Sequence, residues 1–171
     1  MSAAIQRAFI FFLVCVVSLD AFAEHYLTVE EALELAFEKP AKVRKFVLPN
    51  RAPAATKKLL AFSGELKGGG RGAAFIDAVI GKHEPITYMV VVSEEGEVTR
   101  IEILEYRESY GGQVRYESWR EQFTGKKDGD PMHHGTDINN IAGATLSCRH
   151  VTEGVAKILK IFEEQKSELL R

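Results

Sequence analysis

Three strand patterns follow one another in the middle of the chain, and a single long helical pattern ends it. Residues 73–80, 87–93 and 98–106 are rich in apolar and β-branched side chains, and a short turn at Gly96 separates the last two, as in a hairpin. The helical pattern covers residues 147–169 and carries one apolar stripe, formed by Val151, Val155, Ile158, Leu159 and Phe162. We therefore expect an α+β fold, in which an antiparallel β-sheet packs against a C-terminal helix, with N-terminal helices as a further layer.

Alternation of apolar and polar residues over 98–106 predicts that one face of this sheet is exposed to water. Before the sheet, residues 24–72 are expected to form an N-terminal helical region. Thr28 and Glu31 have the spacing of a capping box at the start of its first helix, and Pro40 ends that helix.

Three further segments lie in this N-terminal region. Residues 43–48 predict a short strand, and residues 54–62 predict a second short helix. The glycine-rich residues 68–72 lack the Gly-Lys-Ser/Thr ending of a P-loop and do not form a dinucleotide fingerprint. We interpret them as a flexible hairpin or linker.

The first residues have the pattern of a secretory signal peptide. Arg7 supplies a positive charge, residues 8–19 are almost wholly apolar, and Ala21 and Ala23 fit the small-x-small cleavage rule. We expect a signal peptide over residues 1–23, cleaved after Ala23, and a mature protein exported to the periplasm. The apolar run is short for a membrane span, so a retained anchor is the minor alternative.

Charge and cysteine content exclude some functions and leave others open. The formal net charge is -2, without a basic patch of the kind that binds nucleic acid, and no nucleic-acid partner is expected. After cleavage only Cys148 remains, and a lone cysteine cannot form an internal disulfide. It can be a packing residue near the helix start, a free thiol, or half of a disulfide between chains.

Residues 139–147 form a small-residue elbow in front of the long helix. Gly143 permits backbone geometry that a side chain would forbid, while Thr145 and Ser147 place hydroxyls where the chain enters the helix. Unpaired N–H groups at a helix start attract anions, above all phosphate. Two interpretations follow: a hydroxyl presented beside a phosphate site, or a tight loop with an ordinary N-cap at Thr145 or Ser147.

Two other loops carry candidate functional residues. Residues 106–112 combine aromatic and charged side chains with two glycines, which suits either a binding loop or a solvated turn. His133 and His134 invite a metal interpretation, but no histidine or cysteine lies at a zinc spacing from them.

The sequence from residue 86 to residue 161 resembles the FMN-binding domain of the flavin-carrying subunits of bacterial sodium-pumping NADH:quinone reductase and the Rnf complex, and is similar to small exported single-domain members. The family motif Asp-x-x-Ser/Thr-Gly-Ala-Thr/Ser corresponds to residues 139–145, with Asn139 and Ala142 in place of the acid and the first hydroxyl. Residues 108–112 loosely resemble a second family loop, and residues 119–125 a third.

The resemblance implies FMN as the cofactor, joined by a phosphoester bond to Thr145. An extracytoplasmic flavin transferase would be the partner that makes this bond from FAD. It also implies a set of cofactor-binding residues: Thr145, Gly143, Ala144, Leu146, Ser147, Asn139, Glu108, Tyr110 and Gly111. Candidates for covering the flavin ring are Tyr106, Tyr110, Tyr116 and Trp119. We place the boundary of the expected FMN-binding domain after residue 72, so that the domain covers residues 73–171.

The resulting functional expectation is a periplasmic flavin electron-transfer protein rather than a stand-alone catalyst. Its partners would be redox donor and acceptor proteins, including membrane-bound ones. The alternatives are a binding or sensing module that holds FMN or another phosphate ligand non-covalently, and a cofactor-free accessory subunit.

Overall fold

The computed structural model describes residues 24–49 and 59–171. The expected signal peptide, and residues 54–58 of the expected second helix, lie outside the described residues. In the described part of the chain, no helix is both long and apolar enough to cross a membrane.

A six-stranded sheet forms the centre of the molecule, with strand order β1-β6-β5-β4-β3-β2 and antiparallel pairing throughout. The strands are β1 (Glu24–His25), β2 (Arg44–Leu48), β3 (Leu59–Glu65), β4 (Arg71–Ile80), β5 (Pro85–Ser93) and β6 (Val98–Tyr106). At the centre of the sheet, Val90 pairs with Phe75 on one side and with Ile101 on the other. The three middle strands predicted from the sequence are confirmed.

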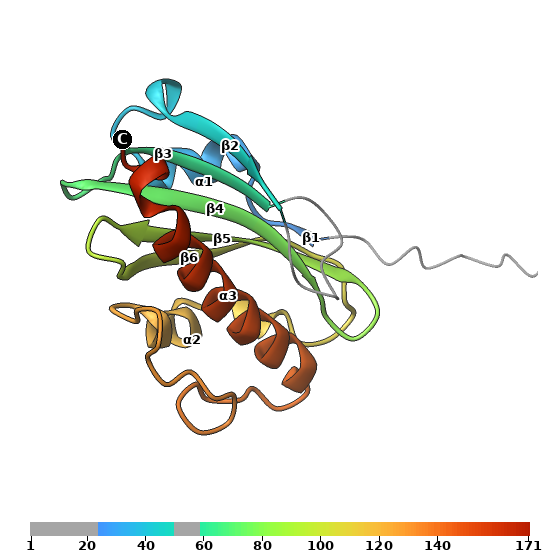
Figure 1. The fold of residues 1–171 in the computed structure, drawn as a ribbon. Helices are drawn as coiled ribbons and strands as arrows, with labels where there is room; N and C mark the ends of the chain where they lie inside the picture. The colour runs from blue at the N-terminus through green and yellow to red at the C-terminus, as the bar shows by residue number, and fades with distance from the viewer. Residues whose placement is uncertain (1–23, 50–58) are drawn as a thin grey trace, which may run out of the picture.

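Helices cover both faces of this sheet (Figure 1). They are α1 (Val29–Ala36), α2 (Glu117–Arg120) and α3 (Thr145–Leu169), with the 3₁₀ turns η1 (Pro40–Lys42), η2 (Gly112–Arg115) and η3 (Glu121–Phe123). The predicted capping box is present at the start of α1, where Thr28 and Glu31 exchange hydrogen bonds. The α+β architecture, with its C-terminal helix and N-terminal helical elements, is confirmed.

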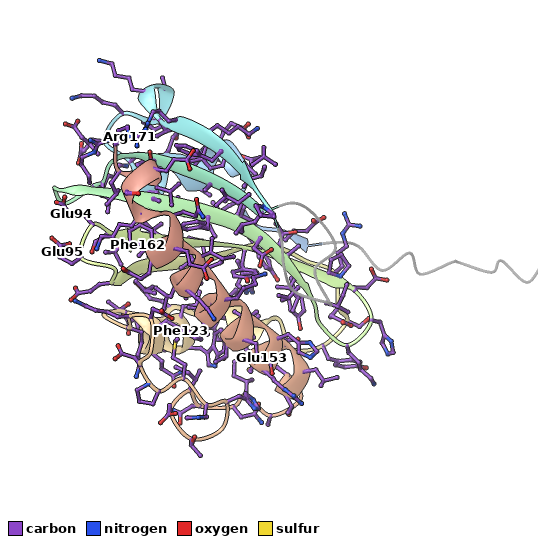
Figure 2. All side chains as sticks on the ribbon, viewed as in Figure 1. Glu94, Glu95, Phe123, Glu153, Phe162 and Arg171 are labelled. Atoms are coloured by element: carbon purple, nitrogen blue, oxygen red, sulfur yellow. The ribbon has the colours of Figure 1, made fainter. Side chains whose placement is uncertain are left out.

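The sheet separates two apolar cores. On one face, α3, which carries Phe162 (Figure 2), packs against β4 and β5. The Phe162 ring meets that of Phe75 edge to face, with 6.3 Å between the ring centres. On the other face, α1 and the residue that follows it, Phe37, pack against Ile76 and Met89. The prediction of one wet face is therefore wrong for β4 and β5, because α1 covers the face that alternation assigned to water.

The predicted helix over residues 54–62 is wrong where it can be checked, because residues 59–62 belong to strand β3. Leu59 and Ala61 face the core under α3, while Phe62 faces the core under α1. Pairing with β2 and β4 thus overrides the local helical preference. The same sheet also extends across the expected boundary at residue 72, which falls within β4.

A buried polar group ties α3 to the sheet. The Tyr88 hydroxyl donates to Asp77 Oδ2 at 2.8 Å, and Lys157 Nζ lies 2.5 Å from the same oxygen. Tyr88 is fully buried, and its ring lies directly beneath Gly154 of α3. Because Gly154 has no side chain, the helix can approach the sheet closely enough for Lys157 to reach Asp77.

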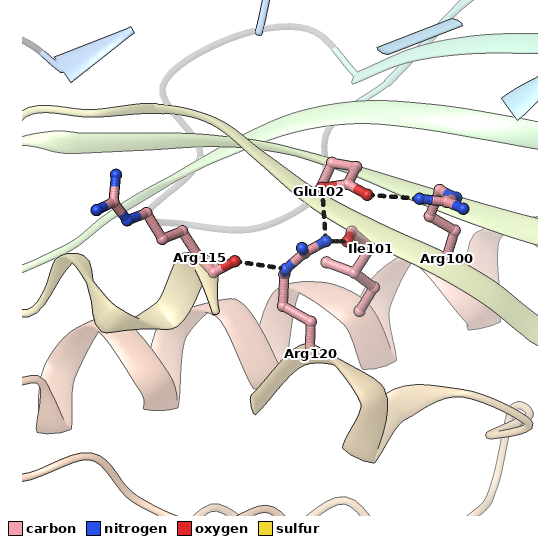
Figure 3. Close-up of polar contacts among 5 residues, drawn as sticks. All are labelled: Arg100, Ile101, Glu102, Arg115 and Arg120. Carbon is pink, nitrogen blue, oxygen red and sulfur yellow. Dashed lines mark hydrogen bonds and ion pairs between the residues drawn. The ribbon is translucent and has the colours of Figure 1, made fainter. Parts of the chain in front are cut away.

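Arg120 anchors the short helical segment of residues 112–123 to strand β6 (Figure 3). Its guanidinium donates to the carbonyl of Arg115 at 2.8 Å, to the carbonyl of Ile101, and to Glu102 Oε2 at 2.5 Å. The other carboxylate oxygen of Glu102 accepts from Arg100 at 2.8 Å. Arg120 therefore joins η2, α2 and β6 through one side chain.

Replacing Arg120 by alanine should lower the free energy of unfolding by about 2–3 kcal/mol, because it removes a largely buried ion pair and two carbonyl hydrogen bonds. Arg100 is a matched control, since it binds the same carboxylate but its side chain is 46% exposed, against 16% for Arg120. Arg100→Ala should cost less than about 1 kcal/mol. Urea unfolding measures both variants, and equal losses would contradict the anchoring role.

Candidate functional site

Helix α3 begins without a side-chain cap. Its N-cap residue is Ala144, which has no group able to accept a hydrogen bond, and the first helical residue is Thr145. The interpretation of Thr145 or Ser147 as an ordinary N-cap is therefore wrong. The N–H groups of the first turn, at Thr145, Leu146 and Ser147, have no partner within the helix and lie at its positive end. Gly143 brings the chain into this turn with a left-handed backbone, at φ 83°.

A cleft of about 540 Å³ opens beside this helix start. Three segments line it: the β4–β5 turn, the loop after β6, and the elbow with the first turn of α3. The lining residues are Lys82, His83, Glu108, Ser109, Tyr110, Gly143, Ala144, Thr145, Leu146 and Ser147. Of the predicted cofactor-binding residues, all except Gly111 and Asn139 line this one cleft.

Tyr106 holds the loop after β6 against the helix start. Its hydroxyl donates to the carbonyl of Tyr110 at 2.6 Å, so its second contact, with Ser147 Oγ at 3.0 Å, is one in which the serine donates. Burial raises the pKa of Tyr106, and the hydroxyl keeps the proton that this arrangement needs. Gly111 packs directly on the elbow, since a Cβ there would lie 2.8 Å from the Cβ of Ala144.

Glu108 fixes the other wall of the cleft. Its Oε1 accepts backbone N–H bonds from His83 at 2.5 Å and from Glu84 at 2.9 Å. Partial burial acts to raise the pKa of Glu108, but the N–H donors of the β4–β5 turn and the nearby His83 outweigh it and lower the pKa below the usual range. Glu108 is thus a carboxylate that holds the turn, and with it Lys82 and His83, at the rim.

The chemistry of the cleft combines a positive end with apolar surface. Lys82 lies in the lining together with the positive end of α3. Tyr110 is 83% exposed and Leu146 is 40% exposed, so both present apolar surface to the cleft rather than to the core. This arrangement suits a molecule that joins an anionic group to a flat aromatic ring. Sequence reasoning missed Lys82 and His83, because their only signal was a place in the turn before a strand.

Asn139 and Asn140 lie on the other side of the elbow and line a second cleft of about 390 Å³, next to Trp119 and Gln122. The backbone of Asn139 anchors the elbow to the 117–123 segment: its carbonyl accepts from Trp119 Nε1, and its N–H donates to Gln122 Oε1, both at 2.8 Å. The side chain that reaches Thr145 is that of Asn140, whose Nδ2 lies 3.2 Å from Thr145 Oγ1. Sequence reasoning singled out Asn139 and missed Asn140.

The other aromatic candidates are placed differently from one another. Tyr110 lines the first cleft, and Tyr116 and Trp119 line the second. Tyr106 and Trp119 also belong to the core under α3. Of the four, Tyr110 is therefore the one that lines the same cleft as Thr145.

Cys148 and His133 make structural contacts. Cys148 is fully buried, and this burial raises the pKa of its thiol, so it is an uncharged packing group. His133 Nδ1 lies 2.6 Å from Asp137 Oδ2. Among the residues that the structure describes, no group of three or more histidine, cysteine, aspartate or glutamate side chains could hold a metal ion.

Tyr106→Phe should lower the free energy of unfolding by about 1–2 kcal/mol and speed amide hydrogen exchange over residues 107–111, because it removes the hydroxyl that joins Tyr110 to Ser147. Hydrogen–deuterium exchange with mass spectrometry measures the loop directly. The matched control is Tyr110→Phe, which removes a hydroxyl from a side chain that is 83% exposed and should leave exchange and stability nearly unchanged. Equal rates of amide exchange over residues 107–111 in the two variants would show that the Tyr106 hydroxyl does not hold this loop.

Part of the chain is similar to a known protein family. Residues 81–160 match the family model of the FMN-binding domain. The matched segment contains every residue that lines the first cleft. Neither the comparison with curated proteins nor that with solved structures found a match.

Proposed function

Because residues 81–160 form an FMN-binding domain, for which FMN is the cofactor, we propose that this chain is a periplasmic electron-transfer protein whose FMN is joined to Thr145 by a phosphoester bond. The observation that carries the proposal is the uncapped start of α3. There Thr145 is the first residue of a helix whose leading N–H groups have no partner in the helix, and it lines the cleft between the elbow and the loop after β6.

The residues of the cleft fit FMN part by part. The phosphate, attached at Thr145, would accept hydrogen bonds from the N–H groups of the first turn of α3. Lys82, also in the lining, supplies a positive charge nearby. Tyr110 and Leu146 supply exposed apolar surface for the isoalloxazine ring. Gly143, where nothing lies within 4 Å of the position that a Cβ would take, leaves room for the ribityl chain and for the flavin transferase that makes the bond.

FMN, when bound, supplies an electron carrier that accepts two electrons and releases them singly. The chain itself would position the cofactor, because Tyr106 joins the loop after β6 to the helix start and Glu108 joins the same loop to the β4–β5 turn. Tyr110 and Leu146 are exposed at the cleft, which suits exchange of electrons with donor and acceptor proteins at the surface. The pattern of residues 1–23 supports export, and hence periplasmic partners, membrane-bound ones included.

A reversible redox titration of the purified flavoprotein tests the carrier function. We expect the flavin absorbance to bleach with a soluble reductant and to return with an oxidant, in the same protein sample and over repeated cycles. A flavin that stays oxidised against strong soluble reductants would instead favour a binding or sensing module.

Non-covalent FMN binding is the second candidate function, and the sequence itself favours it at two positions. Asn139 and Ala142 stand where the family motif has an acid and a hydroxyl residue. Acid precipitation separates the two candidates, because covalent flavin stays with the denatured protein while non-covalent flavin remains in the supernatant.

A further inference from the structure

A chain of two hydrogen bonds ends on the Thr145 hydroxyl. Asn140 Nδ2 lies 3.2 Å from Thr145 Oγ1, and Asn140 Oδ1 lies 3.1 Å from His134 Nε2. An amide nitrogen can only donate and an amide oxygen can only accept. His134 therefore donates to Asn140, and Asn140 donates to Thr145.

We propose that Asn140 is a positioning residue for flavin attachment, held in place by His134, and that it orients the Thr145 hydroxyl toward the flavin transferase. This inference rests on the proposed function, since it concerns the acceptor of the phosphoester bond. It assigns the orienting role to Asn140, whose side-chain amide reaches Thr145, rather than to Asn139, whose backbone is bound to Trp119 and Gln122.

The direction of the hydrogen bonds explains what Asn140 does. The amide N–H occupies one lone pair of Thr145 Oγ1, so the hydroxyl proton cannot be given to Asn140 and is available to an external base. It also favours the rotamer in which Oγ1 lies on the Asn140 side, and thus fixes the direction from which a phosphoryl group can approach. Thr145 and Asn140 are both exposed, so a transferase can reach this pair.

In the attachment step, FAD is the donor of the FMN group. Thr145 Oγ1 attacks the phosphorus nearer the riboflavin, a new O–P bond forms, and the P–O bond to the AMP portion breaks. AMP leaves, and the hydroxyl proton passes to a base on the transferase. Asn140 takes no part in bond making, since its N–H bond to Oγ1 orients the nucleophile before the attack.

The loop of residues 133–138 holds His134 in position. Ile138 at its end is fully buried, and the His133 carbonyl accepts the backbone N–H of Asp137 at 2.9 Å. The Gly135 N–H donates to the Ile138 carbonyl at 2.8 Å. The loop is thus closed on itself and anchored in the core, so half-buried His134 meets Asn140 from a fixed support.

The test measures the initial rate of FMN attachment to purified variants, with an extracytoplasmic flavin transferase and FAD, by intact mass. Asn140→Ala and the near-isosteric Asn140→Asp both remove the N–H donor and should slow attachment about tenfold or more. His134→Ala should slow it about threefold, and should add little in an Asn140→Ala background, because the two residues act in series. Melting temperatures should stay within about 2 °C of the wild type, since neither position is in the core.

Thr136→Ala is the matched control. It removes a hydroxyl that binds the His133 carbonyl in the same loop but leaves His134, Asn140 and Thr145 intact. This variant should be flavinylated at nearly the wild-type rate. Wild-type rates in Asn140→Ala would overturn the positioning role while leaving the proposed attachment to Thr145 standing.

A second measurement reads the same contact without flavin. In the NMR spectrum of the unmodified protein, the side-chain amide signals of Asn140 should shift when Thr145→Val removes the acceptor and when His134→Ala removes the donor. A wild-type chain that takes up no FMN overturns covalent attachment, and with it the role of Asn140 in that step. If neither substitution shifts the side-chain amide signals of Asn140, the hydrogen-bond chain itself is overturned, whatever the flavin result.

Discussion

Thr145→Ala should abolish covalent attachment of FMN and leave the fold unchanged. The hydroxyl of Thr145 is the proposed nucleophile. The Ser147 hydroxyl, in the same first turn, cannot replace it, because Ser147 is buried and bound to the Tyr106 hydroxyl. Because Thr145 is exposed and Ala144 is already the N-cap, the substitution should change stability by less than about 0.5 kcal/mol. Intact mass after coexpression with the transferase measures attachment, and a thermal melt measures the fold.

Thr145→Ser is the matched control, since it keeps a hydroxyl at the same position and should remain flavinylated. Flavin that stays covalently bound in the alanine variant would place the attachment elsewhere. A serine variant without flavin, in a folded protein, would show that the Thr145 methyl group is needed as well as its hydroxyl.

Gly154→Ala should lower the free energy of unfolding by about 1–3 kcal/mol, although alanine ordinarily stabilises a helix by about 1 kcal/mol relative to glycine. A Cβ at residue 154 would overlap the Tyr88 hydroxyl and lie 3.0 Å from Tyr88 Cζ and 3.2 Å from Val79 Cγ1. Tyr88 cannot move aside easily, because it is fully buried and hydrogen bonded to Asp77, which also pairs with Lys157. The helix would have to withdraw from the sheet.

Two comparisons make the Gly154 result specific. Ser167→Ala, at an exposed position of the same helix, should change stability by less than about 0.5 kcal/mol. The double variant Gly154→Ala/Tyr88→Phe should lose less than the sum of its single variants, because Tyr88→Phe removes the overlapping oxygen. Urea unfolding measures all of them. A stabilising effect of Gly154→Ala would contradict the close packing of α3 on β5.

Local patterns predicted the elements that short-range interactions determine. The strands over residues 73–106 and the long C-terminal helix were confirmed, because hydrophobic spacing and the turn between neighbouring strands decide them. The helix expected over 54–62 was wrong at residues 59–62, where pairing with β2 and β4 decides the structure. The wet sheet face was wrong for the same kind of reason, since the sequence does not show that α1 packs there.

The candidate site was predictable as a motif but not as a cleft. The elbow and the loop after β6 carried their own signals, and the FMN-binding family and its cofactor were confirmed by the match over residues 81–160. Lys82 and His83 reach the cleft only because β4 and β5 pair along their length and bring the turn beside the loop. The choice between Asn139 and Asn140 depends on side-chain direction at an elbow, which a sequence does not determine.

Covalent attachment of FMN at Thr145 is the central claim, and the intact mass of the exported protein tests it most directly. The chain is expressed in a bacterial host with an extracytoplasmic flavin transferase, purified from the periplasm, and its peptides are then fragmented to locate any adduct. We expect a yellow protein that begins at Glu24, heavier by one FMN less one water, with the added mass on the peptide that contains Thr145. An unmodified mature mass in a colourless protein, with the transferase shown to be active on another substrate in the same cells, would contradict the claim.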